Sequence, residues 1–309
     1  MIRFLTTRRR LLRKGVYKYN RVRTRQQQFV RENKNLVKAH QNPKKEISAA
    51  KRRKLRPKRE VDEGFKMAYR YRYYNNFSIV DVAKRDIIAL YEEDFGKIDD
   101  SGKAKSMYDV IPAQLSKNVL RYQVGKAIPN EKVDRIINIV KEMEDSMTVN
   151  VAFHSDDPNV GLALTKNDEY FKMYASDTGL FVTLAFKDRD ITENVIYDKL
   201  LSDKLGTNLG YVYENVIAQM LKATGKNLFY HTIPYAEGKK YYEIDFVIPD
   251  GHKISPIEVK SSGYKSHKSL DQFCIKYSDR IMNKYVIYTK DYKRENGIDY
   301  IPVYMTMFL

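Results

Sequence analysis

The sequence predicts a fold of α+β or α/β class, in which a helical region precedes a mixed-sheet domain with the element order α-βββ-α-β. Three observations predict this fold. Apolar residues have helical spacing after residue 76, several segments after residue 190 alternate, and neither period is sustained before residue 76. The chain of 309 residues is 43% apolar and 31% charged, which suffices to bury a core. We expect a basic arm at 1–75, a helical region at 76–190 and a sheet domain at 191–309.

The N-terminal arm, residues 1–75, concentrates the positive charge of the chain. Residues 1–60 hold 22 lysines and arginines against three acidic residues, whereas residues 61–309 hold 34 basic and 36 acidic residues. Blocks such as Arg8-Arg9-Arg10 repel one another, and few large apolar residues offset the entropy cost of ordering. We expect a disordered arm or an aberrant N-terminus. An arm that neutralises phosphates predicts DNA as a partner, and a targeting presequence or a gene-model artefact is the alternative.

The helical region begins with the spacing of a capping box, Ser78 followed by Asp81, and its first helix continues to about Phe95. Short helices and an alternating segment follow. This order is typical of a winged-helix module, which binds DNA in some proteins and only packs against neighbours in others. The predicted apolar face of the first helix comprises Ile79, Val82, Ile87, Leu90 and Tyr91, and the later elements are Met107–Leu115, Glu131–Met147 and a strand at Val149–Phe153.

The sheet domain is predicted from a change in periodicity after residue 190. Two helical patterns lead into three strands, then one helix, then two final strands, which together describe a compact α/β unit with a mixed sheet. The predicted helices are Ile191–Asp203, Asn208–Thr224 and His267–Tyr277, and the predicted strands are Asn227–Ile233, Tyr241–Ile248, Ile254–Lys260, Lys284–Tyr288 and Tyr300–Met305.

Charged residues on two of these strands form the candidate catalytic group. Strand alternation puts Glu243 and Asp245 on one face of their strand and Ile244 and Phe246 on the other. The same alternation puts Glu258 and Lys260 side by side on the next strand. If the two strands pair, the acids and the lysine converge.

This group suits metal-assisted cleavage of a phosphodiester. Asp245 and Glu258 supply hard oxygen ligands for Mg²⁺, which lowers the pKa of a bound water, and Lys260 can orient that water or stabilise the developing charge. Glu214, on the preceding helix, is a candidate for a further ligand at the same edge.

An Asp followed after twelve residues by Glu-x-Lys, within the order α-βββ-α-β, resembles the PD-(D/E)XK phosphodiesterase superfamily. The resemblance implies a nuclease-like domain. Amphipathic strands with charged faces also give this spacing by chance, so a structural origin stays open. A nuclease fold can also lose its chemistry and remain as a binding platform.

A second resemblance covers most of residues 76–309. Several motifs are similar to those of bacterial and archaeal AAA-type ATPases that end in domain of unknown function 4143, which we expect over about residues 85–262. This resemblance implies an N-terminal P-loop ATPase, a winged-helix region and the nuclease-like domain. The segments that carry it are Asp86–Phe95, Ile111–Ser116, Phe171–Leu180, Gly210–Asn215, Glu243–Phe246 and Ile257–Ser262.

The chain departs from that family at the nucleotide site. The string G-x-x-x-x-G-K-[ST], whose amides and lysine hold phosphates, does not occur in the sequence, and the Gly102-Lys103 pair lacks the upstream glycine. We interpret residues 102–106 as a solvated loop and do not expect ATP to bind. We expect a truncated family member, joined to unrelated sequence between about residues 60 and 75.

Other candidates for chemistry or location are weaker. The single cysteine, Cys274, excludes an intrachain disulfide and favours a reducing, cytoplasmic compartment, and we interpret it as a small apolar residue within a helix. The histidines lack the spacing of a zinc site, and the longest apolar run is too short to cross a bilayer. Ser266 is a candidate helix cap, with phosphate binding at that helix start as the alternative.

Together these observations predict a nuclease-like domain that binds DNA and hydrolyses phosphodiesters with Mg²⁺. The alternative is a non-catalytic module that docks DNA or a protein partner, or an inert remnant. The sequence does not predict an oligomeric state.

Overall fold

The computed structural model describes residues 77–188, 210–235, 238, 240–261 and 264–309. The chain divides into two units, Met1–Lys66 and Met67–Leu309, and every described residue belongs to the second. The predictions for the arm at 1–75 and for the helix Ile191–Asp203 therefore lie outside the described residues.

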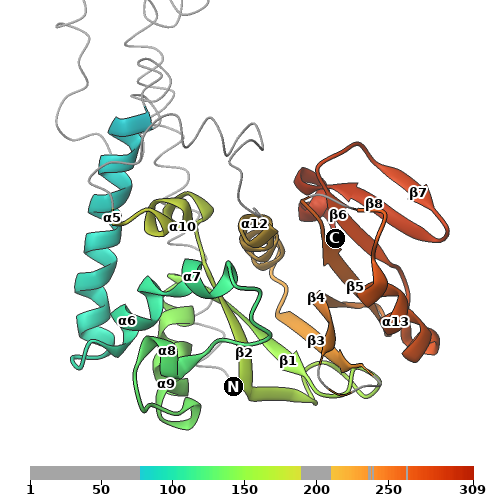
Figure 1. The fold of residues 1–309 in the computed structure, drawn as a ribbon, viewed down its shortest axis with the longest axis horizontal. Coiled ribbons are helices and arrows are strands. Elements are labelled where there is room, and N and C mark those ends of the chain that lie inside the picture. The colour runs from blue at the N-terminus through green and yellow to red at the C-terminus, as the bar shows by residue number, and fades with distance from the viewer. Residues whose placement is uncertain (1–76, 189–209, 236–237, 239, 262–263) are drawn as a thin grey trace, which may run out of the picture. The chain divides into compact units, whose positions relative to one another are not determined.

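Residues 77–188 form a long helix, several shorter helices and a β-hairpin (Figure 1). The predicted helix Met107–Leu115 is two helices, because Pro112 lacks an amide hydrogen and lies in the first turn of a new helix that begins at Ile111. No described helix is both long and apolar enough to cross a membrane. The elements are α5 (Phe77–Ile98), α6 (Lys103–Asp109), α7 (Ile111–Leu115), α8 (Val124–Ala127), α9 (Val133–Asp145), β1 (Val149–Ser155), β2 (Lys166–Ala175) and α10 (Thr178–Ala185).

Helix α5 buries only part of the face that the sequence predicted. Ile87 and Tyr91 of that face pack against the core. Val82 and Leu90 are 47% and 57% exposed, whereas Ile88 and Phe95, seven residues apart, are buried. Seven residues are close to two helical turns, so these two side chains lie on one stripe. Packing therefore covers Phe95 together with Ile87 and Tyr91, and it leaves Val82 and Leu90 exposed.

The predicted capping box at the start of α5 is also wrong. The helix begins at Phe77, so Ser78 lies within it. The Asp81 carboxylate is buried, where it pairs with Arg85 at 2.8 Å and accepts a hydrogen bond from the Thr183 hydroxyl at 3.3 Å. Asp81 therefore joins α5 to α10.

One eight-stranded sheet runs in the order β2-β1-β3-β4-β5-β6-β8-β7 (Figure 1). The hairpin β1–β2 is antiparallel, and β1 pairs in parallel with β3, so the sheet continues across residue 190. The hairpin of the predicted winged-helix-like region is thus part of the same sheet as the C-terminal strands. These strands are β3 (Leu228–Pro234), β4 (Tyr241–Asp250), β5 (Lys253–Val259), β6 (Tyr285–Tyr288), β7 (Lys293–Glu295) and β8 (Ile298–Pro302).

The C-terminal elements follow the predicted order α-βββ-α-β from α12 (Gly210–Ala223) through α13 (Lys268–Lys276) to β6. The short strand β7 and two 3₁₀ segments, η1 (Ser278–Arg280) and η2 (Val303–Phe308), were not predicted. The last predicted strand, Tyr300–Met305, begins instead at Ile298 and ends at Pro302.

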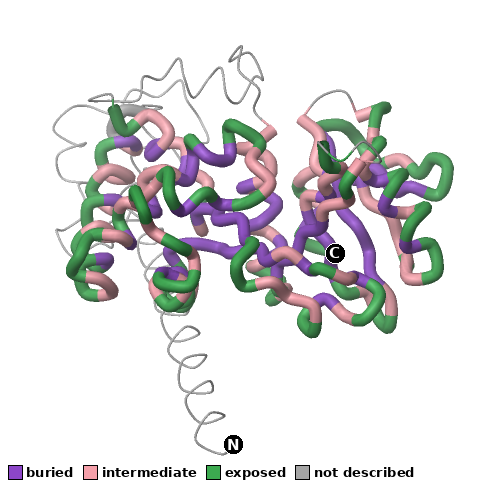
Figure 2. The backbone as a smooth tube through the Cα atoms, turned by 60° about the horizontal axis from the view of Figure 1, so that its bottom comes forward, coloured by how far each residue is buried: buried purple, intermediate pink, exposed green. Residues whose placement is uncertain are grey.

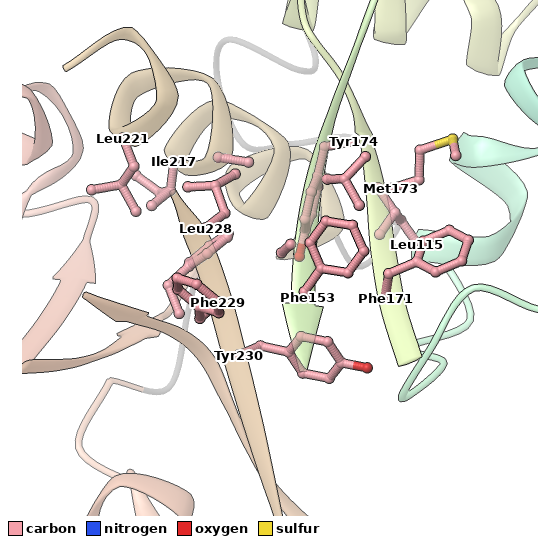
Figure 3. Packing of buried hydrophobic residues seen from close by; sticks show 14 of the residues in the cluster. Leu115, Phe153, Phe171, Met173, Tyr174, Ile217, Leu221, Leu228, Phe229 and Tyr230 are labelled. Carbon is pink, nitrogen blue, oxygen red and sulfur yellow. The ribbon is translucent and has the colours of Figure 1, made fainter. Parts of the chain in front are cut away.

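The core lies between the sheet and helix α12, whose residues Ile217 and Leu221 pack among buried side chains of the strands (Figure 3). The middle strands are buried along much of their length (Figure 2). Burial of one such aliphatic side chain contributes about 1.5–3 kcal/mol. Among the residues around α12 are Phe153, Tyr174, Leu228 and Phe229.

Asn215 fixes α12 to the end of β2. Its Oδ1 accepts from the Ala175 amide at 2.9 Å, and its Nδ2 donates to the Ala175 carbonyl and the Thr178 hydroxyl, both at 3.0 Å. Asp177 is the N-cap of α10 and accepts from the Leu180 amide at 2.8 Å. These bonds set the position of Glu214, the residue before Asn215.

Candidate functional site

Strands β4 and β5 bring the predicted catalytic residues together. The last pair in their antiparallel register is Phe246 with Ile257, and Asp245 and Glu258 directly follow that pair on their two strands. The Val259 amide donates to Asp245 Oδ2 at 2.7 Å, and Lys260 Nζ lies 2.6 Å from Glu258 Oε1. Asp245, Glu258 and Lys260 therefore share one neighbourhood.

A β-bulge in β4 changes the predicted alternation. Phe229 pairs with Val247 and His231 with Ile244, so Tyr230 faces two residues of β4. The prediction that Phe246 lies on the face away from the acids is wrong, because bulged residues do not alternate.

Phe246 in fact packs beside the acidic group. Its ring lies 5.7 Å from that of Tyr174, and the Tyr174 hydroxyl donates to Glu214 Oε2 at 3.4 Å. The bulge thus places the Phe246 ring, packed on Tyr174, next to the carboxylates.

Glu258 uses both of its carboxylate oxygens. Oε1 pairs with Lys260, while Oε2 accepts from the Leu270 amide in the first turn of α13 at 3.1 Å. The N-cap of α13 is His267, so the expected cap at Ser266 is wrong, and the carboxylate from β5 takes that role instead. A negative charge at a helix N-terminus is favourable because the helix dipole is positive there.

A second lysine, Lys172 of β2, lies among the carboxylates. It was not one of the site residues predicted from the sequence. It is only 4% exposed, its Nζ lies 3.6 Å from Glu214 Oε2, and it forms an ion pair with Glu243. Ala152 of β1 is its direct partner in the antiparallel register. The one available signal was a charged residue inside the apolar run Phe171–Ala175.

The cluster is dominated by negative charge. Glu214, Glu243, Asp245 and Glu258 would carry four negative charges, and Lys172 and Lys260 supply two positive ones. Burial and then repulsion from Glu214 hold the pKa of Asp245 well above its ordinary value, and Glu243 and Glu258 raise this pKa further.

Burial lowers the pKa of Lys172, but the attraction of Glu214 and Glu243 outweighs burial and leaves this pKa well above normal. Lys172 is therefore charged at neutral pH. Perturbed titrating groups gathered in this way are common at functional sites.

A basic and aromatic rim follows Lys260 along the chain; we define it as segments 259–261, 264–270 and 289–294. Including residues 262–263, these stretches hold six basic residues and one acid, Asp291, whereas the rest of 61–309 holds 28 basic and 35 acidic residues. Lys290 and Lys293 lie 4.9 Å and 5.0 Å from the centroid of the Tyr264 ring. Such a surface suits a strand of phosphates.

The donor set fits a magnesium ion held by two carboxylates. Among the described residues, no three His, Cys, Asp or Glu side chains are grouped to hold a metal ion. Mg²⁺ does not require three, because it keeps several waters and is usually bound by one or two carboxylates together with substrate phosphates. The pair predicted from the sequence is Asp245 and Glu258, whose carboxylates also have the protein partners described above.

The structure also describes Cys274 and residues 103–106, which the sequence had suggested as minor candidates. Burial raises the pKa of the Cys274 thiol to about 11, which suits the interpretation as an apolar residue and not a nucleophile. Residues 103–106, expected in a solvated loop, form the first turn of α6 after Gly102, whose φ of 77° favours glycine.

Comparison with known proteins bears on the C-terminal part of the chain. A family model described as domain of unknown function DUF4143 matches residues 209–306, about a third of the chain. The match overlaps the expected range of about 85–262 from residue 209 onward and extends beyond it to residue 306. No curated protein and no solved structure matches the chain.

Proposed function

We propose that this protein is a Mg²⁺-dependent phosphodiesterase that acts on DNA at the Asp245–Glu258–Lys260 group. The observation that carries the proposal is the grouping of Asp245 with three other carboxylates, which together outnumber the two lysines paired with them. A buried carboxyl among other carboxylates is costly to ionise unless a cation binds beside it. A hard divalent cation has the matching charge and ligand preference.

Asp245 and Glu258 would hold the metal ion, which when bound supplies a water of lowered pKa and a positive charge for the phosphate. The Val259 amide orients Asp245 by donating to Oδ2. Lys260, paired with Glu258, would supply an ammonium to stabilise the negative charge that develops on the phosphate. The rim lysines then serve to bind the flanking phosphates.

A docking module without catalysis is the second candidate, and Glu258 favours it. Both oxygens of this carboxylate already have partners within the protein, one of them the start of α13. A carboxylate committed to capping a helix stabilises the fold without any chemistry. In this case the rim and the basic arm would bind DNA, and no bond would be cut.

Cleavage assays separate the two candidates. The full chain is incubated with linear, nicked and branched DNA in Mg²⁺ or Mn²⁺, beside a Lys260→Ala variant and an EDTA control. Cleavage that is lost in the variant and in EDTA is the expected result. DNA binding without cleavage of any substrate would refute the phosphodiesterase and leave the docking module.

A further inference from the structure

Lys172 is buried among carboxylates of the acidic cluster. Its ammonium pairs with Glu214 from α12 and with Glu243 from β4. The lysine itself belongs to β2, which is an edge strand and is separated from β4 by β1 and β3. Burying an ammonium is costly unless it is paired, so these two acids account for its position. The same two acids lie within electrostatic range of Asp245.

A buried polar group without a partner adjoins this lysine. The Tyr230 side chain is fully buried, its ring centroid lies 5.7 Å from Lys172 Nζ, and its hydroxyl makes no hydrogen bond within the described part of the chain. Such a hydroxyl leaves hydrogen-bonding capacity for a water or an ion ligand beside the cluster.

Removing the lysine would change the cluster from a partly neutralised group into a stronger cation site. With Lys172 present, Glu214 and Glu243 are engaged, and the net charge of the four acids and two lysines is −2 when all six are ionised. Without Lys172 the same residues would carry −3, and Glu214 and Glu243 would lose the cation that now pairs with both of them. Each added negative charge close to the cation strengthens its binding, because partly buried surroundings screen the attraction between charges only weakly.

We propose that Lys172 acts as an internal cation of the carboxylate cluster and sets its affinity for divalent ions by keeping Glu214 and Glu243 from becoming metal ligands. The proposal rests on the proposed function in placing a metal ion at Asp245 and Glu258. It makes Lys172 a positioning residue, because the lysine acts through the carboxylates and not on the substrate.

The test is a Mn²⁺ titration of the full chain, followed by electron paramagnetic resonance, with no DNA present. Wild type is compared with Lys172→Gln and with a double variant that adds Glu214→Gln. The double variant returns the net charge to −2 and is therefore the matched control. We expect Lys172→Gln to bind Mn²⁺ at least about tenfold more tightly, and the double variant to return towards wild type. Melting in EDTA and in Mn²⁺ gives a second readout, in which Mn²⁺ restores stability that Lys172→Gln loses.

Each outcome decides between the claims. Equal or weaker Mn²⁺ binding by Lys172→Gln would overturn the role of Lys172, while metal-dependent cleavage by wild type would leave the proposed function intact. Mn²⁺ binding by Lys172→Gln but not by wild type would support the role of Lys172 and overturn the proposed function. Absence of Mn²⁺ binding in both proteins would overturn both claims.

Discussion

The buried histidine His231 predicts a specific loss of stability in mild acid. Its Nδ1 donates to the Ser155 carbonyl at 2.7 Å, and its Nε2 accepts from the Tyr277 hydroxyl at 3.0 Å, so the neutral ring joins β3 to β1 and to the end of α13. The ring is 2% exposed. Burial, which disfavours the charged form, lowers its pKa from 6.5 to about 4.

Stability falls with falling pH because the unfolded state binds the His231 proton at a higher pH than the folded state does. As the pH falls below 6.5, the unfolded chain protonates while the folded chain does not, so the contribution of His231 is present above pH 6.5 and is lost towards pH 4. A shift from 6.5 to about 4 corresponds to about 3 kcal/mol in full, of which about 2 kcal/mol is lost by pH 5.

Urea unfolding at pH 8, 6.5 and 5 measures this loss, with His231→Asn as the comparison. The asparagine side chain retains a donor for Ser155 but cannot titrate. We expect the variant to be less stable than wild type at pH 8 and the difference to shrink by about 2 kcal/mol at pH 5. A difference that stays constant from pH 8 to pH 5 would refute the argument.

Two further predictions concern the joint at α12 and the basic and aromatic rim. Asn215→Ala should lower the free energy of unfolding by about 2–4 kcal/mol in urea titrations, since the Ala175 amide and carbonyl both lose their buried partner; a loss below about 1 kcal/mol would contradict this. Replacing three exposed rim lysines by glutamine should weaken DNA binding about tenfold in a fluorescence titration and reduce its salt dependence. The same change at three exposed lysines of the helical region should have a much smaller effect, and equal effects would contradict a specific surface. The rim lysines are Lys265, Lys268 and Lys290, and the control lysines are Lys117, Lys132 and Lys141.

Local periodicity correctly predicted several elements whose apolar pattern lies within the element itself. The strands β3 and β5 and helices α12 and α13 lie within two residues of their predicted ends. Helix α10 was missed because its Asp177-Thr178-Gly179 start has the residues of a turn, and only the cap to Leu180 shows that a helix follows. Such local patterns cannot tell which strands pair.

The candidate site was only half predictable for the same reason. Asp245, Glu258 and Lys260 lie on strands that are consecutive in the chain, so their convergence follows from one hairpin-like pairing. Lys172 reaches the same cluster only because β1 pairs in parallel with β3 across a long connection. The bulge at Asp245 depends on pairing with β3 and likewise has no local signature.

The central claim is that Asp245 and Glu258 bind a divalent cation, and a Mn²⁺ titration of Asp245→Asn tests it most directly. An asparagine oxygen can still accept from the Val259 amide, and the change removes a charge that three other carboxylates repel, so the fold should be retained. We expect one Mn²⁺ per wild-type chain and at least about tenfold weaker binding by the variant. Equal binding by the two proteins would contradict it.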